Sequence, residues 1–472
     1  MAREAPTAVT RPAAPPKAPP EAPPVAALNF GQVLGALSHA LDLTEGQPKG
    51  HCVRSCWIGM RIARQMGLDE ARIADLYYTL LLKDLGCSSN AARICQLYLA
   101  DDQPFKQAFK TVDGSRRGAL AFVLRHTGPG TDLRRRLGAL ARVLRQSDTI
   151  VAELIETRCQ QGAQIAGMMG FSAAVCAGIQ ALDEHWDGGG RPAGLRGREI
   201  PLFSRIALAA QVIDVFHTGA GREAAMSEIA ARAGRWFDPE VARAALACGR
   251  GAALWAELEG PELARRVFEA EPSRAGRAFD EDGLDDVVHA FARVIDAKSP
   301  FTHGHSARVA LYTDLICTEL GYAPEARRWM RRAALMHDIG KLGVSNRILD
   351  KPARLTDAEF DVIRRHPAMG EEILAQVDQF RPMARLAGAH HERLDGKGYP
   401  RGLRAPEISR DVRVLTVSDI FDALTAERPY RAATPLRKTY EIMDAMVGTA
   451  IDPECYAALK RAVAAAEVPG FA

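Results

Sequence analysis

The chain has 472 residues, 47% of them hydrophobic and 25% charged, and a formal net charge of +3. A chain of this length and composition predicts a globular protein of about two to four domains, each able to bury its own core. The near balance of 61 basic and 58 acidic residues, without an apolar run of about 18 residues, argues against nucleic-acid and membrane partners.

The N-terminal segment, residues 1–27, holds eight prolines among alanines, threonines and a few charges. This composition cannot form a packed core and predicts a disordered Pro/Ala-rich tail. The segment lacks the apolar centre of a signal peptide. The nine cysteines show neither a paired framework nor a CxxC motif, so we expect reduced thiols and a cytoplasmic location.

From Leu28 onward, apolar residues follow a helical period almost throughout. One apolar face with this spacing consists of Val287, Val288, Phe291, Val294 and Ile295. Thr356 and Glu359 form a capping box that should open a helix running toward His366. Because strand-like alternation is nearly absent, the sequence predicts an all-α fold.

The chain also repeats itself. An offset of 254 positions aligns His51 with His305, Arg54 with Arg308, Gly67 with Gly321, Asp84 with Asp338 and Gly86 with Gly340. An offset of 208 then aligns residues 184–192 with 392–400, and a third match pairs residues 234–240 with 448–454. The change of offset implies that the first copy carries 46 extra residues between Cys87 and Thr157.

The repeat predicts two tandem helical bundle domains. We expect the first at residues 28–256 and the second at residues 285–472, joined by a linker at 257–284 that is rich in Glu, Arg, Pro and Gly.

Six of the twelve histidines fall within about ninety positions of the second copy: His303, His305, His337, His366, His390 and His391. Asp338 follows one of them directly, and Asp419 lies downstream in an apolar helical run. Imidazole nitrogen and carboxylate oxygen are ligands for divalent metals of borderline hardness. Any single histidine also fits a buried, satisfied core residue, but the set as a whole favours a metal cluster.

His337 and Asp338 are neighbours, and adjacent helical residues point about 100° apart. The pair therefore suits two ions, one bound by the imidazole and both bridged by the carboxylate. Two metals about 3.5–4 Å apart with a bridging hydroxide are a known device for phosphodiester hydrolysis.

The second copy resembles the HD-GYP family of helical phosphodiesterases, which hydrolyse cyclic di-GMP. The resemblance covers roughly residues 285–465. It is carried by the HDIGK run at 337–341, His366-Pro367, the complete HHExxDGxGYP signature at 390–400, and residues 419–425. It implies an HD-type bundle that converts cyclic di-GMP to linear pGpG, with further hydrolysis to GMP left open.

The resemblance also implies the ligand set for two divalent ions, iron or manganese in this family. The ligands would be His305, His337, Asp338, His366, His390, His391 and Asp419, with Asp338 as the bridge. Some members bind a third ion through a Glu that Phe301 replaces here, which favours two ions. Lys341 would protonate the leaving ribose oxygen or steady the phosphate. The alternative for Lys341 is a salt-bridged surface lysine.

Other family positions imply contacts with substrate and partners. Arg428 and Arg431 would hold phosphate or guanine through bidentate donation, with a solvated charge pair as the alternative. Gly398, Tyr399 and Pro400 would form a loop that borders the site. The resemblance leaves open a protein partner at this loop, such as a diguanylate cyclase domain, and a homodimer.

The first copy lacks most of this chemistry. Its equivalents of the seven ligands are His51, Lys83, Asp84, Arg158, Leu182, Asp183 and Gln211, and Cys87 replaces the lysine. Two cations and a leucine at ligand positions predict a degenerate, non-catalytic domain. It would be either a regulatory module that senses, binds nucleotide or dimerises, or an inert packing partner.

The sequence therefore predicts a metal-dependent phosphodiesterase acting on cyclic di-GMP. Two alternatives stay open at this point. The substrate could be another cyclic dinucleotide such as cyclic GMP-AMP, or the site could bind nucleotide or partners for signalling without turnover.

Overall fold

The structure is a computed structural model that describes residues 30–112, 115–272, 280–427 and 432–465. Across these ranges every regular element is a helix, and β-structure is limited to three isolated bridges. The predicted all-α fold is confirmed. The predicted tail at 1–27 lies outside the described residues.

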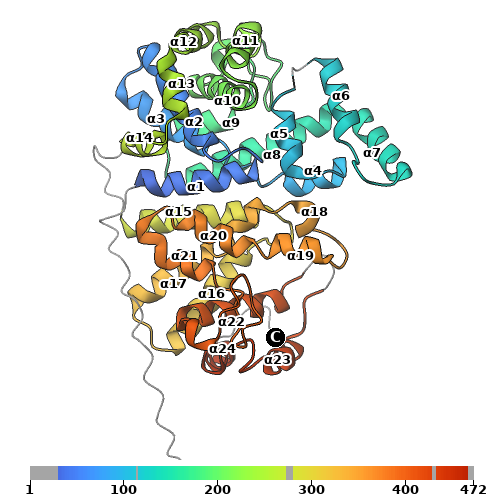
Figure 1. Cartoon of the computed structure of the whole chain (residues 1–472), viewed down its shortest axis with the longest axis vertical. Helices are drawn as coiled ribbons and strands as arrows, with labels where there is room; N and C mark the ends of the chain where they lie inside the picture. Colours follow the sequence, from blue (N-terminus) through green and yellow to red (C-terminus); the bar gives the residue numbers. More distant parts are fainter. Residues whose placement is uncertain (1–29, 113–114, 273–279, 428–431, 466–472) are drawn as a thin grey trace, which may run out of the picture.

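The helices fall into an N-terminal half, residues 30–272, and a C-terminal half, residues 280–465, which lie one above the other in Figure 1. The N-terminal half contains α1 (Phe30–Thr44), α2 (His51–Gln65), α3 (Glu70–Leu82), α4 (Ala91–Tyr98), α5 (Asp102–Phe109), α6 (Arg116–His126), α7 (Leu133–Arg145), α8 (Ser147–Met168), α9 (Ala173–Gln180), η2 (Gly197–Glu199), α10 (Leu202–Ala220), α11 (Arg222–Arg232), α12 (Pro239–Gly249), α13 (Ala252–Glu259) and α14 (Leu263–Glu269).

The C-terminal half contains α15 (Glu281–Asp296), α16 (His305–Glu319), α17 (Pro324–Met336), η4 (Ile339–Gly343), α18 (Asn346–Leu349), α19 (Asp357–Ile363), α20 (His366–Leu374), η5 (Asp378–Phe380), α21 (Arg381–Ala387), η6 (Ala405–Glu407), α22 (Arg410–Thr425), α23 (Leu436–Asp444) and α24 (Pro453–Ala465). The five residues of the predicted apolar face are all buried on α15. The capping box of Thr356 and Glu359 opens α19, as predicted.

The element bounds repeat at the offsets found in the sequence. Helices α2 and α16 both have 15 residues and begin 254 positions apart, each behind a left-handed glycine, Gly50 and Gly304. Helices α3 and α17 keep the same offset, and α10 and α22 begin 208 positions apart. The two halves therefore place corresponding sequence blocks on corresponding helices.

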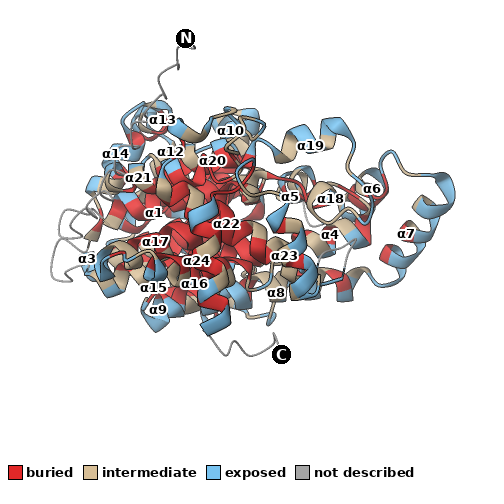
Figure 2. Cartoon of the chain, turned by 90° about the horizontal axis from the view of Figure 1, so that it is seen from below, coloured by how far each residue is buried: buried red, intermediate tan, exposed pale blue. Residues whose placement is uncertain are grey.

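Helix α1 joins the two halves. Nearly all of its residues are buried, on every face of the helix, as its apolar composition requires. It contacts α2 and α14 in its own half and α20 and η4 in the other. Most buried apolar residues of the two halves accordingly form one continuous core. In Figure 2 the buried segments gather at the middle of the molecule, around the labels α1, α17 and α22.

A lateral arm, α4–α7, projects from this body (Figure 1). It has a separate small core that includes Leu97, Phe105, Phe122 and Val143. The arm falls within the segment between Cys87 and Thr157, where the sequence predicts the 46 extra residues. The predicted linker at 257–284 contains α14, which buries Leu263 and Val267, and its residues 273–279 lie outside the described part.

Gly340 marks the closest approach between η4 and α20. A Cβ at this position would overlap the carbonyl oxygen of His366 and press on the backbone nitrogen of Gly370. Gly86 meets the Arg158 carbonyl in the same way in the N-terminal half. Because the obstructing atoms are backbone, they cannot rotate aside.

We therefore expect Gly340→Ala to lower the free energy of unfolding by about 1 to 3 kcal/mol through overpacking. Gly138→Ala is the matched control, because Gly138 is exposed in α7 and a Cβ there meets nothing within 4 Å. The control should raise stability by about 0.5 to 1 kcal/mol. Thermal unfolding of both variants checks the pair, and equal destabilisation would contradict the packing argument.

Candidate metal centre

The seven predicted ligands meet at the centre of the C-terminal half, although they come from separate elements. His305 and His366 begin α16 and α20, His337 and Asp338 lie between α17 and η4, and Asp419 lies on α22. His390 and His391 follow α21. Ligand atoms lie within 4.8 Å of one another in three groups: His305, His337, Asp338; His366, His390, His391; and His337, His390, Asp419.

The carboxylate of Asp338 lies in the middle of the imidazoles. Its Oδ2 is 3.3 Å from Nε2 of both His305 and His337. Its Oδ1 is 3.3 Å from Nε2 of His366 and 3.7 Å from Nε2 of His390. Each carboxylate oxygen therefore faces its own pair of histidines, which is the arrangement expected of a carboxylate that bridges two ions.

The tautomers of three of these histidines follow from their local geometry. His337, His366 and His390 each donate Nδ1–H to the backbone carbonyl three residues earlier, in each case at 2.7 Å. A carbonyl oxygen can only accept, so Nδ1 carries the proton and the Nε2 lone pair points into the centre. Backbone partners of this kind fix the orientation of metal-binding imidazoles.

His305 is oriented by a carboxylate instead. Its Nδ1 lies 2.6 Å from Oδ2 of Asp422, and Arg308 donates two hydrogen bonds to the same carboxylate at 2.5 and 3.1 Å. The sequence interpretation gave no role to Asp422 or Arg308. Two signals were present: Asp422 follows Asp419 by about one helical turn, and Arg308 recurs as Arg54 in the repeat.

Several buried atoms of the centre lack a protein partner. His305 Nε2, His337 Nε2 and Asp338 Oδ1 make no hydrogen bond of good geometry with the described residues. Buried polar atoms are nearly always satisfied. Imidazole nitrogens and carboxylate oxygens that converge without partners are suited to divalent cations, so this donor set fits a metal site.

The electrostatics of the centre also favour a cation. Burial lowers the pKa of His305, but the carboxylates of Asp338 and Asp422 beside its two ring nitrogens raise it further, to about 9. Burial raises the pKa of Asp338, but His337 and Lys341 hold it well below its usual range. In the absence of a metal, a proton on His305 therefore neutralises part of the negative charge of the nearby carboxylates.

A cavity opens beside the centre. Its lining includes Phe301, Thr302, His305, Lys341 and His391. Lys341 Nζ lies 2.5 Å from Asp338 Oδ2, and its side chain is 19% exposed. Lys341 is thus salt-bridged, but to a buried carboxylate at the edge of a cavity rather than to a surface partner.

The predicted border loop lies against the centre. The Tyr399 backbone N–H donates to the His391 carbonyl at 3.2 Å, and the two rings have their centroids 4.8 Å apart. A Cβ on Gly398 would overlap the backbone of residues 391–393, which explains the glycine. The predicted substrate arginines, Arg428 and Arg431, lie outside the described residues.

The N-terminal half has the same framework with a lysine at its centre. His51 Nδ1 lies 2.6 Å from Oδ2 of Asp214, which also accepts from Arg54, as in the C-terminal half. Lys83 Nζ then lies 3.0 Å from His51 Nε2 and pairs with Oδ2 of Asp84. The buried Lys83 ammonium therefore contacts the same two side-chain positions that, as His305 and Asp338, converge in the C-terminal half.

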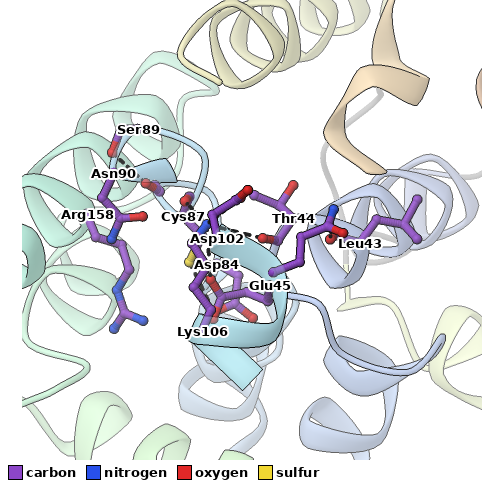
Figure 3. Close-up of polar contacts among 12 residues, drawn as sticks. Leu43, Thr44, Glu45, Asp84, Cys87, Ser89, Asn90, Asp102, Lys106 and Arg158 are labelled. Atoms are coloured by element: carbon purple, nitrogen blue, oxygen red, sulfur yellow. Dashed lines mark hydrogen bonds and ion pairs between the residues drawn. The ribbon is translucent and has the colours of Figure 1, made fainter. Parts of the chain in front are cut away.

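A second cluster in the N-terminal half, Glu45, Asp84 and Cys87, also brings ligand-type atoms within 4.8 Å (Figure 3). Lys110 Nζ lies 2.7 Å from Glu45 Oε2 and 3.9 Å from Asp84 Oδ1. Burial raises the pKa of the Cys87 thiol well above its usual value. A protonated thiol and resident ammonium groups leave this cluster unsuited to a metal.

Known proteins resemble this chain in sequence and in fold. A sequence model of the HD domain family matches residues 138–241 and 289–455. The 3'3'-cGAMP-specific phosphodiesterase 3 of Vibrio cholerae is 50% identical over 432 residues, which are 92% of this chain and 94% of that protein. A crystal structure of a cyclic GMP-AMP-specific phosphodiesterase from V. cholerae superposes with a TM-score of 0.64 at 44% identity, covering 92% of this chain and 98% of that one.

A cyclic di-GMP phosphodiesterase of Thermotoga maritima is 35% identical over 176 residues, 37% of this chain and 48% of that protein. The chain therefore belongs to the HD domain family, and the resemblance drawn from its motifs is confirmed. No helix among the described residues is long and apolar enough to cross a membrane.

The equivalence of His305 and His51 provides a matched test of the centre. His305→Ala removes a donor from the C-terminal half, so we expect bound iron or manganese to fall by about one ion or more per chain. His51→Ala should leave the metal content unchanged, because Lys83 already neutralises Asp84. Elemental analysis of protein purified without oxygen measures both, and metal loss in His51→Ala alone would contradict the assignment.

The raised pKa of His305 predicts a pH dependence. The folded, metal-free protein holds a proton there up to about pH 9, against about 6.5 in the unfolded chain. This proton's contribution to the stability of the metal-free protein is complete below about pH 6.5 and is lost as the pH rises through 9.

Metal binding must displace the proton on His305, so the affinity for manganese should rise up to about tenfold per pH unit between pH 7 and 9. Titration calorimetry in buffers of different ionisation enthalpy measures the release.

Proposed function

We propose that this chain is a metal-dependent phosphodiesterase that hydrolyses a cyclic dinucleotide, with 3'3'-cGAMP as its preferred substrate. The observation that supports this most is the cluster of seven convergent donors, six of them buried, beside a cavity that Lys341 lines. A site retained only for binding would not need so complete a set of donors.

The chain's own residues divide the work. Two divalent ions would be held by His305, His337, Asp338, His366, His390, His391 and Asp419, and the mixed imidazole and carboxylate set suits iron or manganese. When bound, such ions supply activated water for attack on phosphorus. Asp338 holds the Lys341 ammonium at 2.5 Å. From there Lys341 can steady the scissile phosphate and give a proton to the leaving ribose oxygen.

The order of substrates follows from the extent of the similarities. The V. cholerae relative that is specific for 3'3'-cGAMP matches 92% of this chain at 50% identity. The T. maritima cyclic di-GMP phosphodiesterase matches 37% at 35% identity. We therefore rank 3'3'-cGAMP first. Cyclic di-GMP, expected from the motifs, is the second candidate. The relatives that match only part of this chain are divided, because one that is 41% identical over 33% of the chain is specific for 3'3'-cGAMP and the T. maritima enzyme acts on cyclic di-GMP.

We further propose that residues 28–256 form a degenerate, non-catalytic copy of the domain at 285–472. The lysine at its centre, Lys83, supports this assignment, because it contacts both His51 and Asp84. The substrate contacts of Arg428 and Arg431, a diguanylate cyclase partner at the Gly398–Pro400 loop and a homodimer stay predictions.

A panel of cyclic dinucleotides tests the function. Manganese- or iron-loaded protein should hydrolyse 3'3'-cGAMP with a higher kcat/KM than cyclic di-GMP, and Asp338→Ala should abolish metal binding and activity together. Lys341→Met should lower kcat by about 10²- to 10⁴-fold with metal content retained. Chromatography of the products gives the rates. A fully loaded wild-type protein that hydrolyses none of the panel would refute the proposal, and faster cyclic di-GMP turnover would reverse the order.

A further inference from the structure

The arm of the N-terminal half reaches the C-terminal half through a buried carboxylate. Asp102 is the first residue of α5. Its Oδ2 lies 2.8 Å from Lys298 Nζ, and its Oδ1 accepts the backbone N–H of Asn346 at 3.0 Å. The side chains of Asp102 and Lys298 are 0% and 1% exposed. Both carboxylate oxygens of Asp102 thus bind groups of the C-terminal half.

The two segments that Asp102 holds form a wall of the candidate active site. Lys298 lies in the loop between α15 and α16, whose residues Ser299, Phe301 and Thr302 line the cavity. That loop ends at His305. Asn346 begins α18 directly after η4, the turn that carries Lys341. The Asp102 carboxylate therefore contacts two segments of the site. One is the loop that precedes His305, a predicted metal ligand, and the other follows Lys341, the predicted acid.

The two wall segments are also tied to each other. Asn346 Nδ2 donates to the Lys298 carbonyl at 2.5 Å and to Asp350 at 2.7 Å. Ser299 Oγ donates to the other oxygen of Asp350 at 2.5 Å. Asp102 thus completes a network that fixes both sides of the wall in one arrangement.

Helix α5 is firmly held on its own side. Lys106 Nζ donates to the carbonyls of Thr44 at 3.1 Å and Cys87 at 2.6 Å (Figure 3). Gln103 Nε2 donates to Leu43 O at 3.1 Å and across the boundary to Leu342 O at 3.3 Å. Anchored in this way to the N-terminal half, α5 presents Asp102 at a fixed position.

We infer that Asp102 is a positioning residue for the active site, so that the arm of the degenerate half completes the catalytic wall. The inference rests on the proposed function, because the wall is catalytic only if the centre hydrolyses substrate. Asp102 acts through Asn346 and Lys298. Without Asp102, the Asn346 N–H has no acceptor and the Lys298 ammonium is left buried and unpaired in the cavity wall. Misplacement of catalytic groups by about 1 Å can cost up to about 10²-fold in rate.

The test compares Asp102→Ala with Lys49→Ala in the full metal-loaded chain. Lys49 also bridges the halves, pairing with Glu372 at 3.3 Å, but its side chain is 60% exposed and does not line the cavity. Hydrogen–deuterium exchange should increase at residues 298–304 and 344–350 in Asp102→Ala only. With the preferred substrate, kcat should fall about tenfold or more in Asp102→Ala, with KM changed less and metal content retained.

Further variants separate positioning from a loss of stability. Asp102→Asn keeps an acceptor for the Asn346 N–H and should retain more of kcat than Asp102→Ala. Adding Lys298→Met to Asp102→Ala removes the unpaired ammonium, so the melting temperature should recover while kcat stays low. Recovery of kcat together with the melting temperature would overturn the inference, because Asp102 would then be only an ion-pair partner.

The exchange measurement also distinguishes failure of this inference from failure of the proposed function. Hydrogen–deuterium exchange needs no turnover. A wild-type chain that hydrolyses no cyclic dinucleotide would therefore refute the proposed function, and exchange would still test whether Asp102 positions the wall. Unchanged exchange at both segments in Asp102→Ala would overturn the inference even if the enzyme is active.

Discussion

The structure depends on how a buried carboxylate is neutralised. Asp338 and Asp84 occupy equivalent positions and are 1% and 0% exposed, so each needs a cation within its own shell. In the N-terminal half the ammonium groups of Lys83 and Lys110 supply that charge from inside the fold. In the C-terminal half His337 replaces the lysine and Lys341 approaches from the cavity side, which leaves room and lone pairs for metal ions. One electrostatic requirement thus has two solutions on one framework.

The parts that both halves share are those that hold the framework. The His–Asp–Arg arrangement at the start of α2 and α16 is the same in both. Glu184 and Glu392 are both buried, and each accepts backbone N–H groups from the loop about ten residues later, at 2.6 to 3.0 Å. The parts that differ are the atoms that would touch a cation. This separation explains how the helices can repeat while the chemistry does not.

The convergence of the candidate ligands was predictable from the sequence, because a dense set of scarce histidines and a long motif fix their types and spacing. The lysine at the centre of the N-terminal half was predictable from the internal repeat, which aligns Lys83 with His337 in sequence. Asp422 could have been found from its repeat partner Asp214. The contact of Asp102 with Lys298 could not, since 196 positions separate the two residues and Asp102 lies in the segment where the first copy carries its extra residues.

That contact changes which part of the chain should be regarded as the catalytic unit. The motifs alone locate the chemistry in the C-terminal half, and a catalytic domain of that half would seem sufficient. Yet Lys298 is a buried cation whose carboxylate partner belongs to the other half, and a charge buried without its partner is costly. The C-terminal half by itself would have to neutralise Lys298 or expose it, and exposing it would move the loop that leads into His305. Similarity over the whole chain is therefore a better guide to the complete active site than similarity over the motifs alone.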